Sequence, residues 1–551
     1  MNVLFLLASV AFFLWVIRNI LYWVYLWQLK EYRLDRVRIH LTETYQGKSL
    51  LFSYISFLKW STILSFFFVV FYSYLQNIFA LLVTGIFLFQ AFLVVKEGLS
   101  RTLKRPIFTA KAILVVTLTS LTILCLYFIA PLDTFLWLLL LDRSVPFIVG
   151  FFIFIFSFPS ALYKDYIVEQ AMKKINHYKA VKSGGKELLI IGVTGSYGKS
   201  STKEYIAQIL ERKFNVLKTK GTNNTPIGIA KTILRGLKKD THIFVVEMGA
   251  YKRGEIAQMC SIVHPQIGVL TAVNEQHLSL FGSLENTMQA KYELIESLPK
   301  DGLALFNGNN ENSRYLYVHH PKIELEGIKK TKKKKILYQC FKTTQNTAKA
   351  DIAAFNVLAE KDGVSFDVSL DNKVVHFKTP LIGAHVVENI LPGIFIASYL
   401  KMNSAEIKKA VQLLEPMPKT MIRHQLANGV SIIDDTFNAN PDAVSAALDY
   451  INVYKGRKIL VLQPMIELGI KAEDEHYRVA REISKVCNNL FVTNNNFYES
   501  IMQGITDGNG SCSIRIAKPL EIADYIQRNT KRGDIVVFEG KEAAFSLDKI
   551  L

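Results

Sequence analysis

The residues best suited to chemistry lie in ELLIIGVTGSYGKSSTKEYIAQIL, residues 187–210. An apolar run predicts a buried strand, a glycine turn follows, and Lys199 and Ser200 open a predicted helix. Gly195 and Gly198 would let the backbone approach phosphate groups, which bind the N–H groups of a helix N-terminus. Lys199 would reach the β- and γ-phosphates of a nucleotide, and the Ser200 hydroxyl would ligate Mg²⁺.

This loop is a shorter variant of the general pattern GxxxxGK[ST], because Val193 stands where that pattern has its first glycine. A bare GxxGKS is a weak signal. The strand predicted before it and the helix predicted after it supply the context that the motif requires. We therefore predict a nucleotide phosphate site here.

Further polar side chains follow predicted strands. Glu247 ends the apolar run FVVE, and the predicted strand 266–272 delivers Asn274 and His277 to a loop. Lys291 lies on the predicted helix that comes next. The carboxyl ends of parallel strands form the edge where α/β proteins build sites. Taken singly, an acid after a strand is more often a surface residue, and a lone histidine is more often structural.

The order of these motifs resembles that of the Mur ligases, the ATP-dependent amide-bond ligases of peptidoglycan precursor synthesis. The matching segments lie within residues 187–551 and are TGSYGKSSTKE, TKGTNNTPIGIAKTIL, VVEMGAYKRGEI, HPQIGVLTAVNEQHLSLFGSLENTMQAKYELI, DDTFNANPDAVSAAL and ELGIKAEDEHYRVA. The resemblance implies phosphoryl transfer from ATP to a carboxylate and attack of an amine on the acyl phosphate.

The resemblance also implies a role for each matching position. The ATP-binding residues would be Thr194, Gly195, Ser196, Gly198, Lys199, Ser200, Ser201, Asn389 at the adenine, and Arg423 and Asp435 near the phosphates and ribose. The Mg²⁺ ligands would be Ser200, Glu247, His277 and Lys291, the last as a carbamate. The catalytic residues would be Lys199, His277 and Lys291. The substrate contacts would be Asn223, Asn224, Asn438, Asn440 and His476.

Several positions depart from the family pattern. Val386 stands where the family often has Asn, Gln463-Pro464 where Gly-Asp is common, and Phe437 where Tyr is usual. The largest departure is architectural, because apolar segments occupy the place of the family's N-terminal domain, which grips a UDP-sugar. The substrate is therefore expected to be lipid-linked or delivered at a membrane rather than held as a soluble UDP-linked precursor.

Apolar residues are concentrated in residues 1–158, and their runs predict about five membrane-spanning helices. The connections at 30–38 and 96–105 and the stretch after 160 are basic. Since cytoplasmic loops carry the excess of Lys and Arg, these segments and the ligase domains are expected in the cytoplasm, with the N-terminus outside. Asp142 and Arg143 interrupt the last apolar run. Such a pair can mark a transport pathway, but an interfacial or mutually paired charge is the commoner interpretation.

The formal net charge of +18 over 551 residues would suit a nucleic-acid binder. Basic loops beside membrane segments explain it better, and no nucleic-acid module is recognised. The Lys run at 327–335 is interpreted as a solvated loop. The five cysteines show no metal spacing and fit a reducing compartment.

We therefore predict a polytopic α-helical membrane domain (1–158), a basic linker helix (159–186), a P-loop α/β central domain (187–415) and a Rossmann-like C-terminal domain (416–551). The predicted function is a membrane-anchored ATP-dependent carboxylate–amine ligase. Its partners would be Mg²⁺, ATP, the bilayer, a peptidyl or amino-acid carboxylate and an amine. The alternatives are a poly-γ-glutamate or folyl-polyglutamate type ligase, or a non-catalytic membrane scaffold with a retained ATP site.

Overall fold

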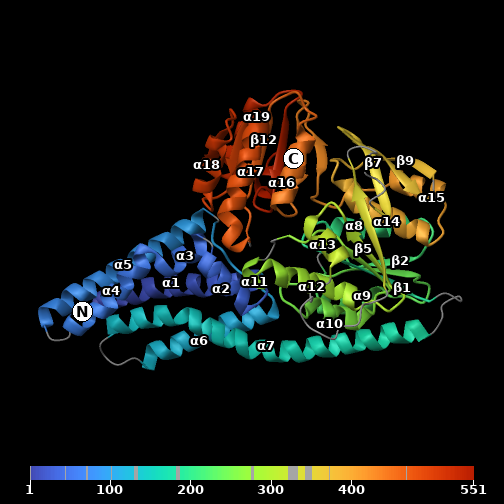
Figure 1. Cartoon of the computed structure of the whole chain (residues 1–551). Helices are drawn as coiled ribbons and strands as arrows, with labels where there is room; N and C mark the ends of the chain where they lie inside the picture. The colour runs from blue at the N-terminus through green and yellow to red at the C-terminus, as the bar shows by residue number, and fades with distance from the viewer. Residues whose placement is uncertain are drawn as a thin grey trace. The chain divides into compact units, whose positions relative to one another are not determined.

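The structure is a computed structural model that describes residues 2–43, 45–69, 72–100, 102–129, 134–180, 187–221, 223–274, 278–319, 333–341, 350–370, 373–466 and 468–551. The chain forms two compact units, Met1–Asp165 and Tyr166–Leu551. The first unit is helical. Its helices are α1 (Asn2–Leu29), α2 (Leu34–Glu43), α3 (Tyr45–Phe52), α4 (Tyr54–Val69), α5 (Ser73–Leu99), α6 (Ala110–Ile129) and the first part of α7 (Thr134–Ala180) (Figure 1).

Five helical stretches of the described chain are long and apolar enough to cross a membrane, by length and composition. They are Val3–Leu29, Gly47–Phe66, Tyr74–Leu99, Ala110–Ile129 and Phe135–Lys179. This number agrees with the prediction of about five spans. Many large apolar side chains of these helices are exposed, Phe147 and Phe154 at 79% each, as expected for surfaces that face lipid.

Helix α7 differs from the sequence prediction. The sequence predicted an interruption near Asp142, Arg143 and Pro146 and a separate linker helix over 159–186. The structure instead has one helix of 47 residues that runs through Pro146 and Pro159 to Ala180. A proline removes one backbone hydrogen bond, and neighbouring helices can compensate for it in a helix bundle. Residues 181–186 lie outside the described part of the chain.

The second unit contains a nine-stranded sheet with the order β2-β3-β1-β4-β5-β6-β7-β8-β9. The strands are β1 (Leu189–Thr194), β2 (Val216–Lys218), β3 (Ile243–Glu247), β4 (Ile267–Leu270), β5 (Leu303–Asn307), β6 (Lys334–Cys340), β7 (Ile352–Glu360), β8 (Gly363–Leu370) and β9 (Lys373–Thr379). Strands β1 to β7 pair in parallel, and β7, β8 and β9 pair antiparallel. The expected mostly parallel sheet is confirmed. The final residues of the Lys run belong to β6, not to a loop.

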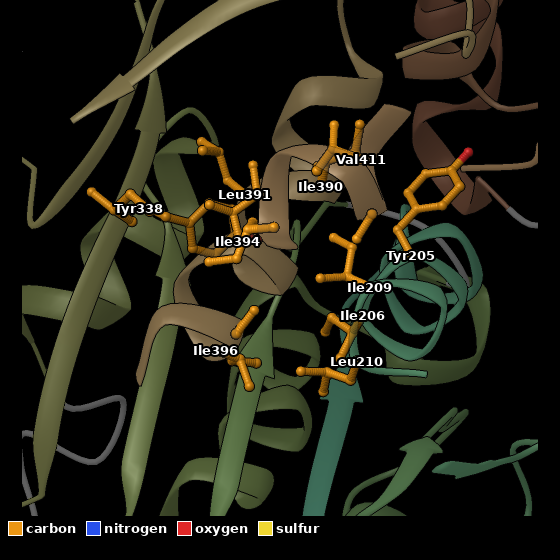
Figure 2. Close-up of a cluster of buried hydrophobic side chains, with 14 of the residues drawn as sticks. Tyr205, Ile206, Ile209, Leu210, Tyr338, Ile390, Leu391, Ile394, Ile396 and Val411 are labelled. Atoms are coloured by element: carbon orange, nitrogen blue, oxygen red, sulfur yellow. The ribbon is translucent and has the colours of Figure 1, made fainter. Parts of the chain in front are cut away.

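The helices associated with this sheet place the phosphate loop. They are α8 (Lys199–Leu210), α9 (Pro226–Gly236), α10 (Glu255–Val263), α11 (Leu278–Phe281), α12 (Leu284–Glu296), α13 (Glu311–Val318), α14 (Val386–Tyr399) and α15 (Ser404–Gln412). Figure 2 shows α8 packed against α14 through Ile206, Ile209, Ile390 and Ile394, all fully buried. Burying each such side chain stabilises the fold by about 1.5–3 kcal/mol. This packing fixes the helix that begins at Lys199.

The rest of the second unit forms a six-stranded sheet with the order β10-β11-β15-β12-β13-β14. Its strands are β10 (Ile422–Gln425), β11 (Ser431–Asp435), β12 (Lys458–Leu462), β13 (Asn489–Val492), β14 (Ser513–Ile516) and β15 (Ile535–Glu539). Its helices are α16 (Pro441–Ile451), η2 (Gly469–Lys471), α17 (Ala472–Val486), α18 (Tyr498–Asp507), α19 (Pro519–Asn529) and α20 (Ala544–Leu547). All neighbours pair in parallel except β10 and β11. The alternation of parallel strands with helices agrees with the Rossmann-like α/β domain predicted from the sequence.

Candidate functional site

The phosphate loop joins β1 to α8 and depends on two glycines. Gly195 has φ +150°, and a Cβ there would lie 2.0 Å from Thr271 Oγ1. Gly198 precedes α8 with φ +77°, and a Cβ there would lie 2.7 Å from Asn389 Oδ1. No side chain of the described residues caps α8. Its first N–H groups are therefore available to an anion.

The other loop residues hold the loop in shape. The Thr194 hydroxyl donates to Met248 O over 2.8 Å, so it joins two strands rather than facing a ligand. The Ser196 hydroxyl donates to Asn274 O at 3.1 Å and accepts from Asn274 N at 3.0 Å. Ser201 lies in the first turn of α8, beside the predicted Mg²⁺ ligand. Thr194 and Ser196 thus support the loop, and an ATP contact for either stays a prediction.

Glu247 lies at the carboxyl end of β3 and is 1% exposed. Its Oε1 accepts hydrogen bonds from Ser200 Oγ at 3.0 Å and Asn224 Nδ2 at 3.1 Å. Its Oε2 forms an ion pair with Lys203 Nζ at 3.4 Å and accepts no hydrogen bond. A buried carboxylate oxygen with spare capacity beside a serine hydroxyl is a donor set that suits Mg²⁺.

Two lysines lie at this site, and burial lowers the pKa of both. Lys199 Nζ donates to Ser196 O at 2.5 Å. Desolvation lowers the pKa of Lys199 to about 8, although the charge of Glu247 opposes the shift. Lys291, on α12, is 3% exposed and donates to Ala250 O at 3.4 Å. Burial, and then the charge of Lys199, hold the pKa of Lys291 well below its usual range. A lowered pKa favours the neutral amine of Lys291, the form that reacts with CO₂.

The loop after β4 carries the remaining central-domain candidates. His277 lies outside the described residues, so its ligand role stays a prediction. Asn274 lies between the central and C-terminal domains: its Oδ1 accepts from Asn310 Nδ2 at 2.6 Å, and its Nδ2 donates to the Asp442 carboxylate. This contact joins the loop after β4 to the first turn of α16.

Asn389 and Arg423 contact protein groups in this conformation. Asn389 accepts from Thr202 Oγ1 at 3.1 Å, which links α14 to the helix of the phosphate loop. Arg423, on the edge strand β10, binds Asp362 at 2.5 Å and Lys361 O at 3.2 Å, on the turn between β7 and β8. The structure thus places Asn389 beside the phosphate loop. It gives Arg423 a carboxylate partner of the central domain in place of a phosphate.

Asp435 lies beside a second buried acid that the sequence analysis did not select. Asp435 and Glu539 are register partners at the carboxyl ends of β11 and β15 and are 6% and 0% exposed. Neither Glu539 oxygen receives a hydrogen bond from an N–H donor. Burial raises the pKa of Asp435 to about 7 and that of Glu539 well above its usual range. The pair therefore shares a proton near neutral pH, since two adjacent buried carboxylates do not both ionise.

The candidate substrate residues are not gathered at one point. Asn440 caps α16 by accepting from Ala443 N at 2.9 Å, and Asn438 and Asn223 are exposed. His476 is 1% exposed, with Nδ1 2.6 Å from Ala472 O. Its Nε2 accepts from Met465 N at 2.9 Å.

Both His476 nitrogens are thus engaged inside the C-terminal domain, and burial lowers the pKa of the ring to about 4. In this conformation the ring of His476 contacts only protein groups among the described residues, and its substrate contact stays a prediction.

Sequence reasoning missed two functional candidates, Lys203 and Glu539. Each had a signal. Glu539 ends the apolar run IVVFE before a glycine, the pattern that identified Glu247 in IFVVE. Lys203 lies three residues after Ser200 in α8, so it shares the helix face that meets Glu247.

Comparison with known proteins assigns the family. Residues 193–397 match the Mur ligase middle domain, and residues 420–542 match the Mur ligase glutamate ligase domain, together more than half of the chain. The chain belongs to the Mur ligase family.

Two curated relatives carry the same printed name, UDP-N-acetylmuramoyl-tripeptide–D-alanyl-D-alanine ligase. The Escherichia coli (strain K12) enzyme is 30% identical over 290 residues, which cover 53% of this chain and 61% of that enzyme. The Bacillus subtilis (strain 168) enzyme is 27% identical, over 64% of this chain and 72% of that enzyme. This Mur ligase thus spans about three fifths of the length of the E. coli relative.

Solved structures agree on the fold. MurF from Acinetobacter baumannii superimposes with a TM-score of 0.60 at 21% identity, over 70% of this chain and 80% of that one. MurF ligase from Thermotoga maritima in complex with ADP superimposes with a TM-score of 0.58 at 23% identity, over 70% of this chain and 82% of that one. The Mur ligase fold of the second unit is thereby established.

Proposed function

We propose that this Mur ligase is a membrane-anchored, ATP-dependent amide-bond ligase of the MurF type. It would join the carboxylate of a peptidyl cell-wall precursor to the amine of D-alanyl-D-alanine, the substrates in the relatives' names. The observation that carries the proposal is the convergence of Ser200, Lys199 and Glu247 at the start of α8. Lys291, on α12, contacts Ala250 O, three residues after Glu247, at 3.4 Å.

The reaction needs activation of the carboxylate, which is a poor acyl donor at neutral pH. The γ-phosphoryl group of ATP would move to a carboxylate oxygen and release ADP. The amine would then attack the carbonyl carbon, phosphate would leave, and the amine would lose a proton. The chain's part is positioning and charge stabilisation. Lys199 and the N–H groups of the loop bind phosphate oxygens, and no nucleophilic side chain is needed.

Mg²⁺ would be held by Ser200 and Glu247, with His277 and carbamylated Lys291 completing the ligands, and it supplies charge neutralisation between phosphate oxygens. The carbamate is supported by the buried, depressed-pKa amine of Lys291. Converting that amine to a carbamate replaces a potential cation with oxygen ligands that hard cations prefer.

The location proposed is a membrane, with the second unit in the cytoplasm. The five apolar helices and the basic connections support this orientation. Because these helices precede the ligase domains, the carboxylate substrate would be lipid-linked or collected at the membrane surface.

Phosphate release by the purified full-length chain tests the function. The chain would receive ATP and Mg²⁺ with D-alanyl-D-alanine and either the UDP-linked or the lipid-linked muramoyl tripeptide, and the product mass would be measured. The lipid-linked substrate should react faster. Lys199→Ala should abolish the reaction, and Lys213→Ala, on the exposed turn after α8, should not. Absence of product with every peptide would favour the scaffold alternative.

A further inference from the structure

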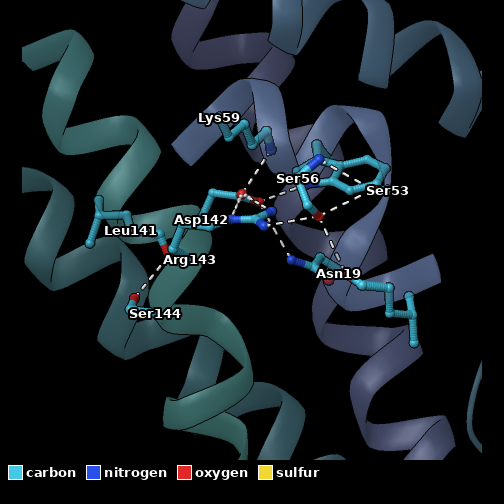
Figure 3. Close-up of polar contacts among 10 residues, drawn as sticks. Asn19, Ser53, Ser56, Lys59, Leu141, Asp142, Arg143 and Ser144 are labelled. Atoms are coloured by element: carbon cyan, nitrogen blue, oxygen red, sulfur yellow. Dashed lines mark hydrogen bonds and ion pairs between the residues drawn. The ribbon is translucent and has the colours of Figure 1, made fainter. Parts of the chain in front are cut away.

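The first unit contains a charged cluster that the ligase reaction does not use. Asp142 on α7 and Lys59 on α4 are both 0% exposed, and Lys59 Nζ lies 2.7 Å from Asp142 Oδ2. Arg143 donates to the same oxygen from Nη2 at 2.6 Å and from Nε at 2.9 Å. Trp15 Nε1 donates to Asp142 Oδ1 at 2.7 Å. Figure 3 shows Lys59, Asp142 and Arg143 converging from α4 and α7.

The charges of this cluster do not balance. Lys59 and Arg143 are cations, and Asp142 is the anion that both contact. The neighbouring Arg18 is paired with Glu97 at 2.8 Å, so that pair adds no net charge. The three cations (Lys59, Arg143 and Arg18) and the two anions (Asp142 and Glu97) therefore leave one excess positive charge among apolar helices. Buried charge at such positions is costly unless it is compensated, and it marks functional sites more often than elsewhere.

A break in one span adds to the positive potential. The span Gly47–Phe66 is interrupted at Ser53, where α3 ends and α4 begins. Ser53 Oγ accepts from Ser56 N at 3.2 Å, so it caps the N-terminus of α4. Arg143 Nη1 lies 3.4 Å from Ser56 Oγ. The N-terminus of a helix carries a partial positive charge, and broken helices in membranes point this end at anionic groups.

We infer that Arg143, Lys59 and the start of α4 form a binding site for a phosphate group within the membrane unit. A phosphate oxygen would be held by Arg143 Nη1, the Ser56 hydroxyl and the Lys59 charge, while Nε and Nη2 of Arg143 stay on Asp142, and the phosphate charge would compensate the excess. Guanidinium matches phosphate geometry better than ammonium does. The inference uses the proposal that the first unit spans a membrane, but it is independent of the ligase reaction.

The phosphate could come from a lipid headgroup or from a soluble ion. Asp142 lies seven residues into the apolar stretch that begins at Phe135, or about 10 Å along the helix. A lipid headgroup drawn inward and a soluble phosphate share the same chemistry here, so the experiment has one arm for each.

Tryptophan emission gives a readout confined to this unit, because all five tryptophans, Trp15, Trp23, Trp27, Trp60 and Trp137, lie within residues 1–158. The full-length chain in detergent would be titrated with inorganic phosphate and, separately, with short-chain phosphatidate, with short-chain diacylglycerol as the uncharged control. Phosphate that binds at the ligase loop leaves this signal unchanged. We expect a saturable change with at least one phosphate compound and none with diacylglycerol.

Two variants test the assignment to the cluster. Arg143→Gln leaves Lys59 and Asp142 as a balanced pair, so the unit should fold while its affinity for phosphate falls about tenfold or more. Lys59→Gln leaves Asp142 and Arg143 balanced and should have the same effect. Lys96→Gln removes an exposed cation of α5 and should bind like the native chain. Circular dichroism would verify folding.

A response to phosphatidate alone identifies a lipid headgroup, and a response to inorganic phosphate identifies a soluble ion. The inference is overturned if the native chain responds to neither, or if Arg143→Gln and Lys59→Gln respond as the native chain does. Phosphate release by the ligase, measured on the same preparations, separates this outcome from failure of the proposed function.

Discussion

Ser200 Oγ donates to Glu247 Oε1 over 3.0 Å and joins the first turn of α8 to the carboxyl end of β3. The hydroxyl and the carboxylate come from segments almost fifty residues apart, and parallel pairing of β1 with β3 brings them together. The contact brings together the two oxygen ligands that the sequence predicted for Mg²⁺. Binding of Mg²⁺ at this pair would depend on the carboxylate charge of Glu247, since a neutral amide is a poorer ligand for a hard cation.

Glu247→Gln should therefore lower the rate of ATP-dependent ligation by about a hundredfold or more, because it removes the charge and keeps the size. The measurement is phosphate release over a range of Mg²⁺ concentrations. The matched control is Glu204→Gln, an acid of α8 that pairs with Lys218. If both variants retain native rates at low Mg²⁺, Glu247 is not a metal ligand.

Gly195→Ala should abolish nucleotide binding. It should also lower the free energy of unfolding of the central domain by more than the strain of a positive φ would, because the added Cβ clashes as well. Its Cβ would lie 2.0 Å from Thr271 Oγ1. Gly254 has φ +88° with no atom within 4 Å of an added Cβ. Gly254→Ala should thus cost only about 1–2 kcal/mol of left-handed strain and leave nucleotide affinity intact. Binding of a fluorescent ATP analogue should be measured for both variants. If Gly195→Ala and Gly254→Ala lose the same affinity, backbone strain and not the clash with Thr271 explains the loss.

The orientation of the chain can be tested with reporter fusions. Fusions after residues 40, 105 and 170 should all report cytoplasm, because the basic connections lie at these positions. A reporter active only outside the cytoplasm gives the complementary signal. An external signal at 105 would require a different assignment of spans.

Much of the site was predictable because its signals are local. The phosphate loop, the strand that delivers Glu247 and the helix of Lys291 each follow from a short apolar pattern next to a polar residue. The long helix α7 was not predictable in this way. Asp142, Arg143 and Pro146 predicted an interruption of the span, whereas tertiary contacts that a local pattern does not show, such as Lys59 to Asp142, accompany one continuous helix.

The acid pair of the C-terminal domain shows the same limit. Asp435 was found through its motif, but its raised pKa comes from burial in the folded domain, and its neighbour Glu539 lies more than a hundred residues later, adjacent only through pairing of β11 with β15. His476 was assigned to the substrate because of its motif, whereas its two ring nitrogens bond to Met465 N, before α17, and to Ala472 O, in the first turn of α17.

Lys291 should be carbamylated in the active enzyme. Its side chain is 3% exposed, and burial keeps its pKa well below the usual range, which favours the neutral amine that reacts with CO₂. Lys291→Ala should lose ligation, and short-chain carboxylates such as acetate should restore part of it by supplying the missing oxygens. Lys300→Ala, at an exposed position after α12, should be unaffected. Native activity of Lys291→Ala, without any response to acetate, would rule the modification out.

The Asp435–Glu539 pair predicts a pH-dependent stability of the C-terminal domain. The folded-state pKa of Asp435 is raised from 3.8 to about 7. A raised pKa means that the folded state binds the proton more tightly than the unfolded state. The contribution to stability is complete below about pH 4 and is lost as pH rises through about 7.

Amide protection of β11 and β15, corrected for the intrinsic exchange rate, should therefore fall between pH 5 and pH 8. Glu539→Gln keeps a hydrogen-bond donor beside Asp435 and removes the competing carboxyl. Burial still raises the pKa of Asp435 in this variant, but the Gln amide can donate to its carboxylate, so protection should decline less than in the native chain and be higher than native at pH 8. Glu499→Gln, at an exposed position of α18, should retain the native decline. An equal decline in Glu539→Gln would show that the two acids do not share a proton.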